Sequence, residues 1–195
     1  MRTFTIIAMT IIIISCKSTP LDRKNPASAF GRLSVCVDKA SVDCLFKELD
    51  RGSRWSVHSI YRTLAQTRGL ISNSYPTDNT LRDQALGTWK KEAASKNAAE
   101  MFRVFCQKRS CLRTLAQGFG AVVKVKKTNE NTAIVETTRG KTFQMSAAEG
   151  EWGLATYKDE LYKTKIRLMD NLKQVRRNAA AYDEQRRAVG TDKEK

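Results

Sequence analysis

Few residues in this chain have the types and spacings that catalysis needs. Its 195 residues include one histidine and ten glycines. The single histidine, His58, excludes a metal site built from several histidines and any mechanism that needs two imidazoles. The glycines form no phosphate-binding loop, no dinucleotide-binding fingerprint and no nucleophile elbow. We therefore expect a protein that is not an enzyme and that needs neither a cofactor nor a metal ion.

The remaining polar and aromatic candidates have structural explanations. His58 borders an apolar helical stripe, so we expect a half-buried structural histidine rather than a general base. Ser53 follows a break in the chain and is expected to cap the helix that begins there. No spacing singles out a catalytic pair among the acidic residues Asp43, Glu48 and Asp50. The three tryptophans are expected in the core or at its edge: Trp55, Trp89 and Trp152.

The chain also lacks an apolar run that could cross a bilayer as a helix, which takes about 20 residues. Its N-terminal apolar stretch, residues 4–14, follows Arg2 and leads into Ile13-Ile14-Ser15-Cys16. This length and this charge are typical of a signal-peptide core. The last four residues resemble the lipobox of bacterial lipoproteins, in which aliphatic and small residues precede a cysteine.

The resemblance implies that residues 1–15 are a signal peptide and that Cys16 receives the acyl chains that anchor the mature protein. Residues 16–24 would form a short lipidated tether. Several acyl chains anchor a protein almost permanently, whereas one short chain binds reversibly. Lys17 replaces the aspartate that retains such lipoproteins at the inner membrane, which favours the outer membrane of the cell envelope. The alternative is an ordinary secretory signal peptide followed by an unmodified cysteine.

Acidic residues are scarce, with 20 against 35 basic residues and a formal net charge of +15. Cleavage before Cys16 would remove one charged residue, Arg2, and leave +14. Such a charge would indicate nucleic acid in a cytoplasmic protein, but export makes nucleic acid an unexpected partner. The expected partners are the membrane and an anionic envelope component or acidic protein. The alternative is that the charge only keeps the protein soluble.

Four cysteines remain after Cys16, with three possible pairings: Cys36, Cys44, Cys106 and Cys111. The oxidising environment of an exported protein favours disulfides. Cys36 and Cys44 would lie about 12 Å apart along a continuous helix, but a disulfide needs α-carbons within about 7 Å. Turns at residues 38–41 and 108–110 would allow local pairing, which we expect for both pairs. Free buried thiols and a zinc site are the alternatives, although the spacings fit zinc poorly.

Helical spacing of apolar residues dominates the first half of the mature chain. Asn25-Pro26 fits an N-cap followed by a first-turn proline and begins a globular domain over residues 25–157. Ser41 and Asn97 are expected to cap later helices. Two further helical regions are predicted, one through residues 81–89 and one over residues 97–115, which contains the turn expected at residues 108–110.

After Gly118 the spacing changes to the alternation of strands. Four strands are predicted between residues 121 and 157, joined by turns at residues 129–131, 139–140 and 149–150. They form an antiparallel meander whose apolar face the preceding helices must cover. In the first strand this face is expected to hold Ala121, Val123 and Val125. The fold class is therefore α+β, with N-terminal helices packed on a four-stranded antiparallel meander.

The meander ends in Glu149-Gly150-Glu151-Trp152-Gly153-Leu154, and residues 26–157 resemble the nuclear-transport-factor-like or cystatin-like α+β domain. The extra helices between residues 53 and 116 depart from that pattern. The chain is also similar to uncharacterised bacterial lipoproteins that share the sequences at residues 49–56 and 118–123. No activity follows from this group. The fold resemblance implies an alternative function, a small-ligand pocket, possibly catalytic, on the concave face of the sheet.

The chain has no proline or glycine from Lys158 until Gly190, which predicts one long helix over residues 158–189. Its basic residues would form a partner-binding surface: Lys165, Lys173, Arg176, Arg177, Arg186 and Arg187. In one arrangement the first half of this helix packs on the domain and the second half projects into solvent. A coiled-coil seam along the whole helix is the alternative. Residues 190–195 are expected to be a disordered tail. The sequence thus favours a lipid-anchored, non-enzymatic binding or scaffold module for an anionic envelope partner.

Overall fold

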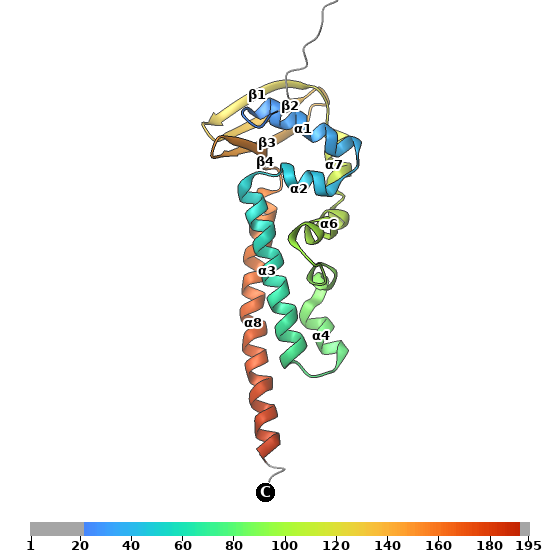
Figure 1. The fold of residues 1–195 in the computed structure, drawn as a ribbon, viewed down its shortest axis with the longest axis vertical. Helices are drawn as coiled ribbons and strands as arrows, with labels where there is room; N and C mark the ends of the chain where they lie inside the picture. The colour runs from blue at the N-terminus through green and yellow to red at the C-terminus, as the bar shows by residue number, and fades with distance from the viewer. Residues whose placement is uncertain (1–21, 192–195) are drawn as a thin grey trace, which may run out of the picture.

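The computed structural model describes residues 22–191 and has the predicted α+β fold (Figure 1). A four-stranded sheet and the helices that cover it lie at one end, and two long helices run to the opposite end. The expected signal peptide, the lipobox-like residues with Cys16, and residues 192–195 of the expected tail lie outside the described residues. Within residues 22–191, no helix has the length and the apolar character needed to cross a membrane.

The sheet is the predicted antiparallel meander, and its strands follow one another in chain order. Its strands are β1 (Val122–Asn129), β2 (Thr132–Thr137), β3 (Thr142–Ala148) and β4 (Glu151–Leu154). Ala133 of β2 lies opposite Met145 of β3, which in turn lies opposite Leu154 of β4. All three side chains are buried, so the alternation in the sequence correctly predicts the covered face.

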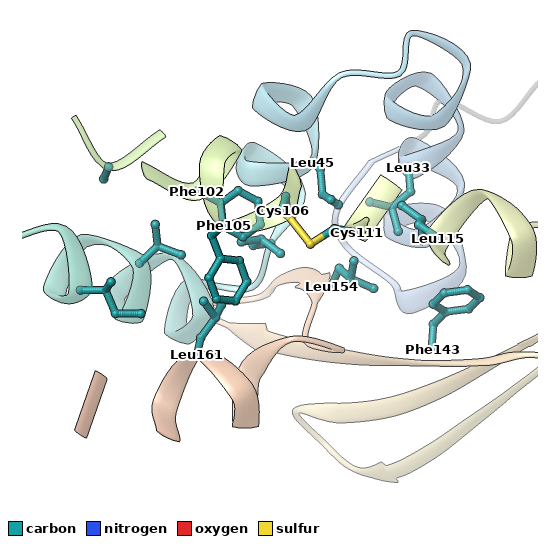
Figure 2. Close-up of a cluster of buried hydrophobic side chains, with 14 of the residues drawn as sticks. Leu33, Leu45, Phe102, Phe105, Cys106, Cys111, Leu115, Phe143, Leu154 and Leu161 are labelled. Carbon is teal, nitrogen blue, oxygen red and sulfur yellow. A yellow bond between two sulfur atoms is a disulfide. The ribbon is translucent and has the colours of Figure 1, made fainter. Parts of the chain in front are cut away.

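Helices α1 (Pro26–Asp38), α2 (Val42–Glu48) and α7 (Cys111–Gly118) lie at the sheet end. Phe30 of α1 is fully buried, and its ring centroid lies 4.9 Å from that of Phe119 and 5.1 Å from that of Phe143. Leu33 and Leu115 fill the neighbouring space (Figure 2). The covered face, on which the fold resemblance would place a ligand, is thus occupied by packed side chains.

Strand β1 differs from the prediction because its apolar residues are not covered. Val123 is 62% exposed, and Val125 is only partly buried. The pairing of β1 with β2 shifts between Val122 and Lys124, so the expected alternation is interrupted at the β-bulge. Since β1 is an edge strand, its three lysines also leave one sheet edge charged, which opposes pairing with other chains.

The longest elements, α3 (Arg51–Ser74) and α8 (Lys158–Thr191), form a parallel pair that leaves the sheet together (Figure 1). Buried residues of α8 recur at helical spacing: Leu161, Leu168, Leu172, Val175 and Ala179. At the far end, Ser74 donates a hydrogen bond to the Asp183 carboxylate at 3.2 Å. Packing therefore continues beyond the first half of α8, and only its last turns extend past α3.

The remaining helices are α4 (Asn79–Leu86), α5 (Lys90–Ala93) and α6 (Ala98–Arg109), with a 3-10 turn, η1 (Gly87–Trp89), before α5. The prediction of one helix through residues 81–89 is wrong, because α4 ends at Gly87, which has φ +54°. The helical region predicted over residues 97–115 is divided into α6 and α7 at Ser110, which has φ +53° and lies in the predicted turn. Left-handed backbone of this kind terminates an α-helix.

Both local disulfides are present, Cys36–Cys44 and Cys106–Cys111, with α-carbons 5.1 and 4.9 Å apart. In each case the helix breaks between the two cysteines, as the sequence predicts. Ala40 and Ser110, at these breaks, both have positive φ. The first disulfide therefore joins α1 to the start of α2, and the second joins α6 to α7.

Candidate functional site

A surface pocket of about 540 Å³ lies between the first half of α3 and the β3–β4 turn. Four arginines line it: Arg23, Arg51, Arg54 and Arg62. His58, Trp55 and Trp152 also contribute to its wall. This combination of cationic and aromatic groups makes the pocket the candidate site.

Helix α3 supplies one wall of the pocket through residues two helical turns apart. Arg54, His58 and Arg62 follow an i, i+4, i+8 spacing, so they lie on one face of the helix. His58 is exposed, although the sequence analysis expects it to be half-buried. Its imidazole ring lies 5.8 Å from the ring of Phe46, and no apolar stripe covers it.

Trp55 is the second correction on this helix. Trp55 is predicted in the core or at its edge, but 62% of its surface is exposed. Trp152, by contrast, is 5% exposed and belongs to the core, as predicted. An exposed tryptophan beside a pocket offers a large apolar surface and an indole N–H to a ligand.

The start of α3 is fixed by Asp50 rather than by Ser53, so the predicted cap is wrong. The Asp50 carboxylate accepts hydrogen bonds from the backbone N–H groups of Gly52 at 2.8 Å and Ser53 at 3.2 Å. It also accepts from the Ser53 hydroxyl. A buried carboxylate at this position satisfies the helix terminus and complements its dipole. Asp50 is therefore occupied by the helix and is not a free acid of the pocket.

The floor of the pocket depends on a close approach between α3 and β4. The Asp50 N–H donates to the Leu154 carbonyl at 3.0 Å, which adds residues 49–50 to the edge of the sheet. A Cβ atom on Gly153 would lie 2.7 Å from the Asp50 backbone. Only glycine permits this contact, so Gly153 holds the β3–β4 turn against the start of α3.

Arg23 forms the third side of the pocket and belongs to the folded domain. Its carbonyl accepts a hydrogen bond from the Trp152 N–H at 2.8 Å. Its guanidinium donates to the Lys47 carbonyl at 2.6 Å and contacts the carboxylates of Glu48 and Glu151. Residues 22–24, which the sequence analysis assigns to the tether, are therefore held against the fold.

Glu48 is the buried anion beneath this side of the pocket. Burial by itself would raise the pKa of its carboxyl, but the hydrogen bond from Arg32 and the positive charges of Arg23 and Arg32 outweigh burial and lower the pKa. Arg32 donates to Glu48 at 2.7 Å. Glu48 thus stays ionised and joins α1, α2 and the N-terminal segment.

The charges around the pocket do not cancel. Arg51 pairs with Glu149, and Arg23 pairs with Glu151, so both exposed carboxylates of the pocket already have a cationic partner. Within residues 22–191, neither Arg54 nor Arg62 forms an ion pair, and the Arg54 Nε is buried without a hydrogen-bond partner. Burying a donor without a partner costs about 1–3 kcal/mol.

The basic residues predicted to form one surface on α8 make separate contacts. Lys165 is partly buried and lies 4.9 Å from the Tyr162 ring centroid. Three of its other residues bond to side chains of their own helix: Lys173 to Asp170, Arg177 to Gln174 and Arg186 to Asp183. Arg176 and Arg187 are exposed. None of these residues lines the pocket, and Arg186 and Arg187 lie near the opposite end of the α3–α8 pair.

Grouped metal ligands do not occur in the part of the chain that is described. Between residues 22 and 191, no three histidine, cysteine or acidic side chains are grouped as metal ligands. The four cysteines of this range are held in disulfides. The arginines and Trp55 of the pocket are groups that could hold an anion with an apolar portion.

No family model, curated protein or solved structure matches this chain.

Proposed function

We propose that this protein is a lipid-anchored, non-enzymatic binding module of the bacterial cell envelope, and that it holds an anionic partner in the arginine-lined pocket. The lipobox resemblance supports anchoring through Cys16 and an outer-membrane location. The excess of basic residues supports an anionic partner. Two disulfides fit an oxidising compartment such as the periplasm.

One observation carries the proposal: Arg54 and Arg62 face the pocket without an anionic partner, while every carboxylate around them is already engaged. Arginine recognises carboxylates and phosphates through two parallel hydrogen bonds. Because Arg54 and Arg62 both line the pocket, an acceptor bound there would meet forked cationic donors.

A second candidate is a scaffold that binds its partner through the basic surface of α8. Arg176 and Arg187 are exposed there, and the last turns of the helix extend past α3. Its exposed cations are dispersed along the helix, so this surface would act through long-range attraction that salt screens. The pocket offers closer and less hydrated contacts.

Binding of purified protein to four anionic probes separates these candidates. The probes are phosphatidylglycerol vesicles, lipid A, soluble peptidoglycan peptides and polyglutamate. We expect at least one to bind, and Arg54→Gln/Arg62→Gln to weaken that binding roughly tenfold or more. The matched control, Lys173→Gln/Arg176→Gln, removes the same charge from α8 and should change binding less than about twofold. Failure of all four probes to bind would refute the proposed function, and the opposite pattern between the two variants would favour α8.

A further inference from the structure

We propose that the pocket binds the phosphate head group of an anionic lipid in the membrane to which the chain is tethered. This inference rests on the proposed function and names the partner of the same site. Three features of the described residues support it: the placement of the two unpaired arginines, the exposed tryptophan and the position of Arg23.

The unpaired cations form a row rather than an isolated charge. Arg54 and Arg62 are two turns apart, about 12 Å along α3, with His58 between them. The Arg54 guanidinium is partly buried and the Arg62 guanidinium is exposed, so the row leads from the inside of the pocket to its mouth. A phosphate offers several acceptor oxygens and suits the forked donors of arginine.

The tryptophan distinguishes a lipid from a purely ionic ligand. Trp55 is on the same helix, 62% exposed, and Leu49 and Trp152 add apolar groups to the pocket lining. Tryptophan is enriched where membrane and water meet, since its ring is apolar and its N–H is polar. A head group with its glycerol and first methylenes would use the arginines and the tryptophan together.

The position of Arg23 limits how far the pocket can lie from the bilayer. Arg23 follows Cys16 by seven residues, and a fully extended chain spans at most about 3.6 Å per residue. The pocket rim is therefore within about 25 Å of the acylated residue. The C-terminal ends of α3 and α8 lie far from the sheet and from the pocket beside it (Figure 1). The pocket, and not the tip of α8, is thus held near the lipid head groups.

The test uses mature protein with Cys16→Ser, which has no acyl chain, and measures cosedimentation with vesicles. Vesicles of phosphatidylcholine alone are compared with vesicles in which about one lipid in three is phosphatidylglycerol. We expect binding only to the second, and a loss of roughly 25-fold in partitioning for Arg54→Gln/Arg62→Gln. Trp55→Ala should also weaken binding, while Lys173→Gln/Arg176→Gln should leave it within about twofold. Circular dichroism and thermal melts confirm that each variant is folded.

Inorganic phosphate and polyglutamate serve as competitors and separate the possible sources of the anion. Competition by phosphate at millimolar concentration, together with vesicle binding, supports recognition of the phosphate itself. Phosphate binding without vesicle binding would refute the lipid assignment, as would equal binding to both kinds of vesicle. Pocket-dependent binding of polyglutamate alone would also refute it, but would leave the proposed function intact. Vesicle binding that is unchanged by the pocket variants would place the lipid elsewhere and refute this inference.

Discussion

At the scale of single residues, Tyr157 couples the fold to pH. Its hydroxyl donates to the Cys111 carbonyl at 3.2 Å, just where α7 begins. Burial, with a smaller contribution from Glu160, raises the pKa of Tyr157 to about 12. The folded protein therefore keeps this proton more tightly than the unfolded chain, in which tyrosine ionises near pH 10. Stability from this residue is complete below about pH 10 and is lost as the pH rises toward about 12.

We predict that the free energy of unfolding falls by on the order of 2 kcal/mol across this window because of Tyr157. Denaturant unfolding at pH 8, 10 and 12 measures the decrease. Tyr157→Phe should be about 1 kcal/mol less stable at pH 8, since it loses the hydrogen bond, but should show a smaller alkaline decrease. The control is Tyr162→Phe, which changes a tyrosine that is 54% exposed. Identical pH profiles for Tyr157→Phe and the native protein would contradict the assignment.

At the scale of elements, the two disulfides stabilise breaks between helices that contact the core. Cys106 and Cys111 are themselves buried in it (Figure 2). We predict that reduction lowers the free energy of unfolding by about 2–3 kcal/mol per disulfide, because each closes a short loop in the unfolded chain. Denaturant unfolding with and without reductant tests this, and Cys36→Ser/Cys44→Ser isolates the contribution of the second bridge. An unchanged midpoint after complete reduction, verified by thiol titration, would show that the bridges do not contribute.

Local signals explain which elements the sequence could predict. Caps at Asn25, Ser41 and Asn97 act within three residues of themselves, and all three are present in the structure. The alternation of apolar and polar residues in β2 and β3 also predicts which of their side chains are buried. The first residue of α3 is harder to predict, because Asp50 and Ser53 are both good caps. Only the approach of Leu154 decides between them.

The pocket cannot be predicted from local signals either, because its walls come from segments that are far apart in the sequence. The i, i+4, i+8 row of Arg54, His58 and Arg62 is visible in the sequence, but a row of polar residues usually marks a solvated helix face. It becomes a wall only because Gly153, about a hundred residues later, lets the β3–β4 turn approach Asp50. Neither signal alone predicts a pocket, and pairing them needs the tertiary structure.

At the scale of the whole molecule, the positive charge is divided between two ends with different surroundings. Arg23, seven residues after the proposed lipidation site, lies at the pocket, while Arg186 and Arg187 lie at the distal end of α8. The helix of 34 residues is about 51 Å long, several times the Debye length at physiological salt. The two charged regions therefore act independently, and a change at one should leave binding at the other intact.

Tether length should then matter for the pocket and not for anchoring. We predict that inserting twelve Gly/Ser residues after Lys17 leaves the lipidated protein in the membrane fraction, since the acyl chains hold it there. The insertion makes the tether almost three times as long, so the concentration of head groups at the pocket should fall about fivefold. Quenching of Trp55 by lipids brominated near the head group, measured against Trp55→Phe, reports this contact. In the control Cys16→Ser, a high-salt wash should release the protein from the membrane fraction, because head-group binding by the pocket is screened by salt and acyl anchoring is not. Salt-resistant fractionation of this variant would contradict lipidation, and unchanged quenching after the insertion would contradict pocket binding limited by the tether.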